Sequence, residues 1–237
     1  MHRLWAHIFS STTRHFPKRK EQLVSTRITS KQRDVLGVSA LRPDGIAKTQ
    51  GTFSFSSDYT ADNMLWGATL RSPHPYARII SIDISEAIKI DGVETVLLSE
   101  DVPGKLTYGL IASDQPVFAS DYVRYMGEPI AAVAADHPET CRRALDAIIV
   151  HYEVLKPLTS IEDALNPNTP SIHPDGNVFR HQHILHGDAN ATGDIVVEGE
   201  YEIGMQDQAF LGLEAALAYP DSDGSGIELV VATQWLQ

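Results

Sequence analysis

The chain has 237 residues, of which 43% are hydrophobic, and a formal net charge of -12 at pH 7. This length and apolar content suffice for one large domain or two smaller ones with a proper core. The negative charge excludes a general nucleic-acid binder, which needs a basic face for phosphates, and no segment has the roughly 18 consecutive apolar residues of a membrane span.

The charge is unevenly distributed along the chain. Residues 1–35 contain eight Lys or Arg against Glu21 and Asp34, which makes this segment +6 and leaves -18 for the remainder. The segment is rich in Ser and Thr and has no sustained apolar run. We interpret residues 1–35 as a basic disordered extension, with a targeting segment as the alternative. A secretory signal is disfavoured because His7 interrupts its short apolar run.

Alternating apolar and polar residues then predict a series of strands. Pro73 and Pro75 remove ladder donors and end the first of them. His74 lies between these prolines, and we assign it to loop packing because no carboxylate or nucleophile in the same motif can orient it. A short helix at 85–90 is predicted, with Ser85 as its N-cap. The strands are predicted at 64–70, 79–84 and 93–98.

A strand of small residues at 130–135 is predicted to be buried on both faces. Pro138 stands at a first-turn position, and apolar residues form one stripe over 138–147, which predicts an amphipathic helix. A strand at 148–154 follows. The order strand, helix, strand over 130–154 predicts a βαβ-like step in which the helix covers the sheet.

Cys141 is the only cysteine and lies on the apolar stripe of this helix. No intrachain disulfide is possible, which favours a reduced, cytoplasmic compartment. We assign the thiol to structural burial rather than to nucleophilic chemistry. An iron–sulfur cluster held by four thiolates cannot be built within this chain.

A short helix at 160–165 ends in an Asn- and Pro-rich breaker, and we interpret residues 166–193 as a linker. It contains four histidines, of which His181 and His183 would share one face of an extended strand. A metal site is the alternative. We favour a solvated arm because the spacing of known zinc patterns is missing.

The last segment contains two predicted strands, at 196–203 and 227–232. Gly204 permits a sharp bend after the first, which would present Gln206 and Gln208 around a carboxylate. Two interpretations stay open from these residues alone. The amides are either solvated side chains at a strand end or part of a polar site on a turn.

Four stretches resemble the xanthine dehydrogenase and aldehyde oxidase family. They are the RPDG start at 42–45, the segment 62–104, the segment 111–135 and IGMQDQAFLGLEAALAYP at 203–220. The resemblance implies an α/β (α+β) fold, in which an a/b hammerhead domain with a mixed sheet and covering helices precedes the first strands of a molybdopterin-binding domain. The implied limits are 36–165 for the hammerhead domain, 166–193 for the linker and 194–237 for the start of the molybdopterin-binding domain. The linker contains Asp175-Gly176-Asn177, which matches the family's connection at this place.

The order of motifs most resembles the molybdenum-binding subunit of bacterial xanthine dehydrogenases, which implies oxidative hydroxylation of purines, from xanthine or hypoxanthine to urate. By register, Gln206 is the catalytic and cofactor-binding candidate, because its amide would donate a hydrogen bond to a molybdenum-bound oxygen without adding charge. No residue of this chain is implied as a metal ligand.

The cofactor implied for the complete enzyme is molybdenum-molybdopterin, with iron–sulfur clusters and FAD on other domains or subunits. The implied partners are the remaining molybdopterin-binding part, the iron–sulfur and FAD subunits and a purine, with no nucleic acid and no membrane. The family's glycine-rich segment and base glutamate are missing, so we expect a truncated or split subunit that is inactive and cofactor-free alone. The alternative is a non-catalytic hammerhead module that acts in subunit assembly. A hydrolase is disfavoured because Gly224-Ser225-Gly226 lacks the spacing of a nucleophile elbow.

Overall fold

The computed structural model describes residues 39–110, 112–207, 214–221, 223 and 225–233. The predicted basic extension at 1–35 and the side chain of Gln208 lie outside the described residues. The chain divides into two compact units, one formed by residues 63–203 and the other by residues before 63 together with those after 203.

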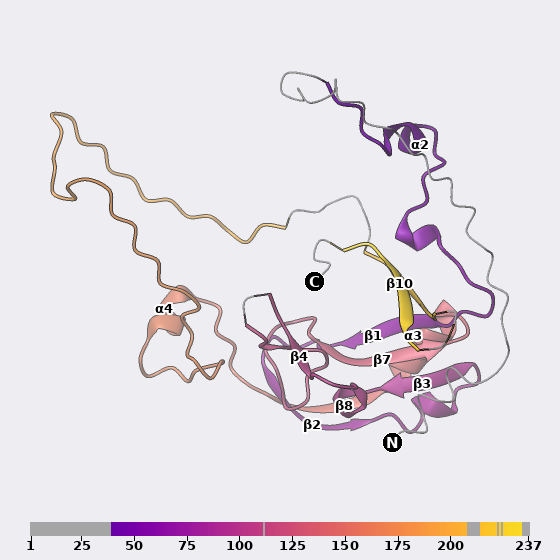
Figure 1. Ribbon diagram of the computed structural model, residues 1–237. Helices are drawn as coiled ribbons and strands as arrows, with labels where there is room; N and C mark the ends of the chain where they lie inside the picture. The colour runs from indigo at the N-terminus through magenta and orange to yellow at the C-terminus, as the bar shows by residue number, and fades with distance from the viewer. Residues whose placement is uncertain (1–38, 111, 208–213, 222, 224, 234–237) are drawn as a thin grey trace. The chain divides into compact units, whose positions relative to one another are not determined.

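The unit of residues 63–203 is built on antiparallel strands. One sheet has the order β1-β7-β3 and another the order β6-β2-β8, while β4 and β5 form a small pair (Figure 1). The strands are β1 Trp66–Arg71, β2 Ala77–Asp83, β3 Val93–Leu97, β4 Thr107–Tyr108, β5 Gln115–Pro116, β6 Tyr122–Val123, β7 Pro129–Ala135 and β8 Ile149–Val154. The helical segments are η2 Ala87–Lys89, η3 Ser99–Asp101, α3 Pro138–Ala147 and α4 Ile161–Leu165.

Strand β7 is the centre of this unit, as the small-residue pattern predicts. It pairs with β1 on one edge and β3 on the other, and most of its residues are buried. Helix α3 packs against it, and the shared core contains Val133, Cys141 and Ala144. A second cluster joins Ile130 of β7 to Ala77 of β2. The α/β fold class with a covering helix is therefore confirmed.

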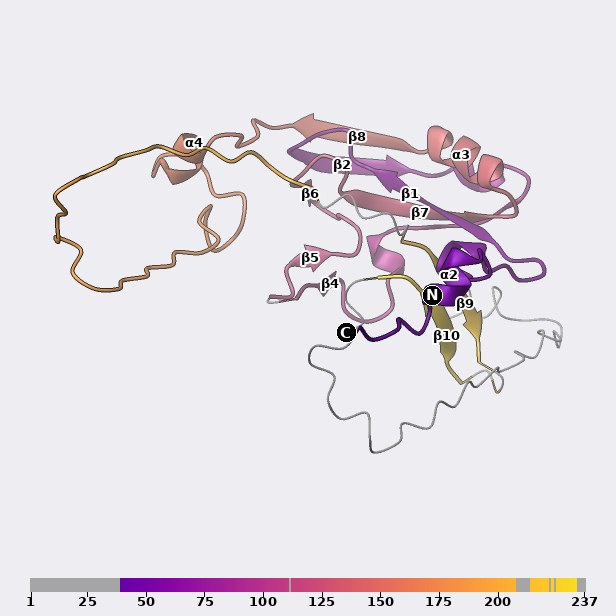
Figure 2. The same ribbon diagram turned by 90° about the horizontal axis from the view of Figure 1, so that it is seen from above.

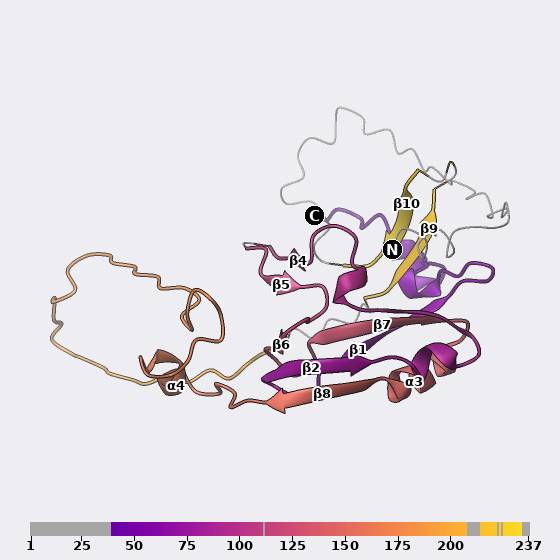
Figure 3. The same ribbon diagram turned by 90° about the horizontal axis from the view of Figure 1, so that it is seen from below.

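The expected βαβ-like step is wrong. Strand β8 does not join the sheet of β7 but pairs with β2, with Val154 opposite Ala77 (Figure 3). The physical reason is that β1 and β3 already occupy both hydrogen-bonding edges of β7. A strand that follows α3 must therefore find its partner elsewhere.

The short helix predicted at 85–90 is only the 3₁₀ turn η2, and Ser85 is not its N-cap. The backbone N–H of Ser85 instead donates to Oδ1 of Asp83 at 2.9 Å. This hydrogen bond is the main cause that lowers the pKa of Asp83. An Asx-type turn thus competes successfully with the helical cap.

Residues 166–203 contain no helix or strand, and they run as a long loop in Figure 2. The strand predicted at 196–203 is therefore wrong for this structure. Its apolar side chains are exposed, including Val197 at 89% and Ile203 at 79%. A strand pattern needs a partner for its backbone groups, and no described residue supplies one here. The limits proposed for the linker and domains stay a prediction.

The other unit contains α2 Gly45–Thr49, η1 Ser56–Asp58 and the antiparallel pair β9 Ala216–Pro220 and β10 Ile227–Val231. A turn at Pro43 and Asp44 leads directly into α2. Asp44 pairs with Arg42 and with Lys48. The hydrogen bond from Arg42 has the largest effect and that from Lys48 the next, and together they hold the pKa of Asp44 well below its usual range. Across the described residues of both units, no helix is long and apolar enough to cross a membrane.

Candidate functional site

The residue singled out by sequence, Gln206, is exposed and lies in neither a helix nor a strand. The preceding Gly204 is not among the glycines with positive φ, and a Cβ placed on it would meet nothing within 4 Å. The expected sharp bend therefore does not form at this glycine. No hydrogen bond or ion pair joins Gln206 to another described residue.

The chemistry available at Gln206 is that of one neutral donor. Its amide NH2 can hydrogen-bond an oxygen without changing the local charge. A bound pyranopterin needs many donors in a shaped cavity, whereas this amide stands on an exposed segment. Among the residues that the structure describes, no group of three or more His, Cys, Asp or Glu could hold a metal ion. Within the described part of the chain, Gln206 therefore offers such a group a single exposed donor.

The histidines of the linker are exposed. They lie at 173, 181, 183 and 186, in the loop that follows α4. His181 and His183 do not share a strand face, because this segment forms no strand. The interpretation as a solvated arm agrees with this arrangement.

His74 is held by packing, as its sequence context predicts. Its ring lies edge-on to the ring of Tyr152, with 4.8 Å between centroids. Its backbone N–H donates to Oγ of Ser72 at 3.0 Å, and this hydroxyl donates in turn to the backbone carbonyl of His74. Burial raises the pKa of Tyr152. The hydroxyl of Ser72 thus closes the loop through the backbone of His74.

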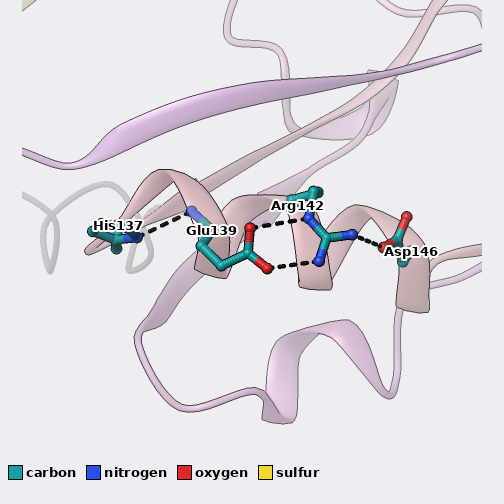
Figure 4. A network of polar contacts seen from close by, with 4 residues as sticks. All are labelled: His137, Glu139, Arg142 and Asp146. Carbon is teal, nitrogen blue, oxygen red and sulfur yellow. Dashed lines mark hydrogen bonds and ion pairs between the residues drawn. The ribbon is translucent and has the colours of Figure 1, made fainter.

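Cys141 is buried, with 1% exposure, and its Sγ donates to the carbonyl of Trp66 at 3.1 Å. Burial is the largest effect on this thiol and raises its pKa. The neighbouring Arg142 is engaged with Glu139 and Asp146 on the outer face of α3, beside the His137 cap (Figure 4). The prediction of a structurally buried thiol is confirmed.

One buried carboxylate was missed by the sequence analysis. Glu128 is 2% exposed, and its Oε2 accepts a short hydrogen bond from the backbone N–H of Arg124. Its carbonyl accepts from the backbone N–H of Ser72 at 2.9 Å. The only sequence signal is a glutamate set between Gly127 and Pro129 at the start of a buried strand. Both contacts fix the turn that leads into β7, so we assign Glu128 to the fold.

The attachment of the linker carries no signal in the sequence. Nε of Arg124 donates to the carbonyl of Ile172 at 3.4 Å. The side-chain amide of Asn177 closes the same loop, because its Oδ1 accepts from the N–H of Ile172 at 2.9 Å and its Nδ2 donates to the carbonyl of Pro170 at 3.3 Å. Arg124 thus ties the first part of the linker to the turn before β7, and Asn177 closes that part of the linker on itself.

Residues 50–156 match the family model described as "Aldehyde oxidase and xanthine dehydrogenase, a/b hammerhead domain". The chain is 40% identical over 207 residues to the nicotinate dehydrogenase large molybdopterin subunit of Eubacterium barkeri, a match that covers 86% of this chain and 48% of that protein. It is 38% identical over 199 residues to a probable xanthine dehydrogenase subunit of Bacillus subtilis, covering 83% of this chain and 27% of that one.

Among solved structures, CO dehydrogenase from Oligotropha carboxidovorans matches with a TM-score of 0.54 and 32% identity. That match covers 59% of this chain and 18% of the other. The chain thus spans about half or less of the length of these curated relatives. The matched segment 50–156 contains the strands β1 to β8 and helix α3, which form the buried core of their unit.

Proposed function

We propose that residues 50–156 form an a/b hammerhead domain of the aldehyde oxidase and xanthine dehydrogenase family. From this premise, the chain contributes that domain to the molybdopterin-binding subunit of a molybdenum hydroxylase. One observation carries the proposal: the matched segment coincides with a complete folded core, from β1 through α3 to β8. The relatives from Eubacterium barkeri and Bacillus subtilis support it, since both are named as dehydrogenase subunits.

The proposed reaction is oxidative hydroxylation of a purine, from xanthine or hypoxanthine to urate. The name of the Eubacterium barkeri relative makes nicotinate the second candidate. Purines and nicotinate share an electron-poor nitrogen heterocycle, which is the chemical class that we assign to the substrate. The proposed location is the cytoplasm, in keeping with a single, buried thiol.

The proposed cofactor is molybdenum-molybdopterin, which would supply the redox chemistry when bound. We expect the rest of a molybdopterin-binding region to provide its cradle, and iron–sulfur and FAD domains or subunits to carry the electrons away. Within this chain only Gln206 has a proposed role at that centre, as one neutral hydrogen-bond donor. The alternative is a non-catalytic module in subunit assembly, which the complete hammerhead core would also suit.

The test is Gln206→Ala in a complex completed by the remaining molybdopterin-binding region and loaded with molybdenum. One oxyanion-type donor is worth about 10²-fold in rate or more, or about 3 kcal/mol, so turnover should fall by that factor. Folding and molybdenum content should stay nearly unchanged. Xanthine, hypoxanthine and nicotinate are compared as substrates in the same assay.

Gln208→Ala is the matched control, because it removes the same amide two positions along, and we expect a smaller effect. Equal and negligible effects of both substitutions would show that the glutamine segment has no role in turnover. A completed, molybdenum-loaded complex that oxidises none of the three heterocycles would instead support the assembly module.

A second test uses the chain alone, expressed in a host that makes molybdopterin. We expect metal analysis to find less than stoichiometric molybdenum, because one exposed amide cannot hold a pyranopterin. Stoichiometric molybdenum in the purified chain would contradict this expectation and would place a cofactor site within these residues.

A further inference from the structure

Residues 166–177, the first part of the segment assigned to the linker, are a series of closed turns. The N–H of Thr169 donates to the carbonyl of Asn166 at 3.0 Å. The side-chain amide of Asn177 closes the next turn, with the N–H of Ile172 on its Oδ1 and the carbonyl of Pro170 on its Nδ2. Asn side chains stabilise turns by such bonds to nearby backbone groups. These residues therefore follow a defined path, although they form no helix or strand.

One side chain of the hammerhead core contacts this segment. Nε of Arg124 donates to the backbone carbonyl of Ile172 at 3.4 Å. The guanidinium also lies over the ring of Tyr122, 5.9 Å from its centroid, and that ring stacks on Tyr76 with 6.2 Å between centroids. A guanidinium that is held over an aromatic ring has fewer orientations open to its Nε–H. The two stacked rings therefore help to aim a charged donor at the linker.

The backbone of Arg124 is fixed to the same core. Its N–H donates to Oε2 of Glu128, which is buried. Nη1 of Arg71, at the end of β1, donates to the carbonyl of Gly127 at 2.9 Å. The turn at 124–128 is therefore held from two sides, by the residue that precedes β7 and by β1. The side chain of Arg124 thus starts from a fixed point of the core.

The acceptor distinguishes Arg124 from an ordinary surface arginine. Arg78, which stands opposite Tyr122 on the neighbouring strand β2, pairs with the carboxylate of Glu153 at 2.7 Å. Among the ion pairs of the described residues, none includes Arg124. An arginine side chain has five N–H donors and no acceptor, so its position is set by the acceptors around it. For Nε of Arg124 this acceptor is the carbonyl of Ile172 rather than an acidic side chain.

We propose that residues 166–177 are a strap fastened to the hammerhead core by Arg124. The chain then leaves the core after Asn177 rather than at the end of α4. Single turns are marginal in water, so the contact from Arg124 keeps the turns of the strap closed, and its loss opens them together. The strap is a conformational device that sets the point from which the chain departs toward Gln206. It needs no molybdenum cofactor and is independent of the proposed hydroxylase.

The test is amide hydrogen exchange of the full chain, with residues 129–135 of β7 as the reference for an intact core. Arg124→Met removes the charge and every donor but keeps most of the length of the side chain. We expect exchange at residues 166–177 to become about tenfold faster and exchange at residues 129–135 to stay unchanged. Arg124→Lys keeps the charge but has no Nε–H donor beside the ring, so it should loosen the strap as well.

Arg78→Met is the matched control. It removes the same side chain from the position opposite Tyr122, where the guanidinium pairs with Glu153 instead of the linker. Exchange at residues 166–177 should therefore stay unchanged in this variant. The comparison separates the contact with the strap from the loss of one positive charge on the same sheet.

Four outcomes would overturn the inference. The first is unchanged exchange at residues 166–177 in Arg124→Met, and the second is equal acceleration in Arg78→Met. The third is a wild-type rate in Arg124→Lys, which would make any cation sufficient. The fourth is faster exchange of residues 129–135 together with the strap, which would make Arg124 a general stabiliser of the core. No turnover is measured in this test, so the strap and the proposed role of Gln206 can fail separately.

Discussion

Substitution of Ile130 by Ala tests whether β7 is the centre of the hammerhead core. The side chain of Ile130 is fully buried in a cluster with Ala77 of β2 and Val123 of β6. The change removes three carbons, which are worth about 2.4 kcal/mol at about 0.8 kcal/mol for each buried methylene. Its neighbours lie largely on strands held in place by their hydrogen-bonded partners, so the backbone cannot move in to close the cavity. We therefore expect a total loss of about 3–4 kcal/mol in the free energy of unfolding.

The measurement is equilibrium urea unfolding, followed by tryptophan fluorescence and by circular dichroism. Ile149→Ala is the matched control, because the same atoms are removed at the first residue of β8, where the side chain is 51% exposed. We expect the control to lose less than about 1.5 kcal/mol. Similar losses in both variants would refute the assignment of Ile130 to a closed core.

The remaining predictions concern α3. Because burial raises the pKa of the Cys141 thiol, reaction with an aromatic disulfide reagent should be slow in the native chain and fast in urea. Its folded pKa lies above the unfolded value, so stability should fall as the pH rises through the ordinary thiol range near about 8.5. Fast native labelling would contradict the buried position. Arg142→Ala should leave the urea midpoint nearly unchanged, since the ion pairs with Glu139 and Asp146 are exposed. Arg142 lowers the pKa of Glu139, so the contribution of this ion pair should be lost only as the pH falls below the ordinary range of carboxylates, and a difference that persists in strong acid would point to packing.

Local patterns were sufficient to predict several elements and their limits. Pro138 and the apolar stripe predicted the helix at 138–147, and α3 has these bounds. The small apolar residues at 130–135 predicted a strand buried on both faces, and β7 begins one residue earlier. The helix predicted at 160–165 is α4 Ile161–Leu165. Oγ of Ser160 accepts from the N–H of Asp163 and so acts as its N-cap. These signals depend on residues within one or two turns of each other.

The tertiary structure alone decided which strands pair and which polar groups are buried. The pattern of β8 predicts a strand but carries no information on its partner, which is β2 because both edges of β7 are occupied. Glu128 is buried because its carboxylate accepts from the N–H of Arg124 and its backbone carbonyl accepts from the N–H of Ser72. Glutamate is mostly an exposed residue type, so the sequence does not predict this burial. Residues 196–203 have a strand pattern but remain unpaired in this structure. A strand is completed by a non-local partner, so its sequence can specify the two faces of the chain but not whether a ladder forms.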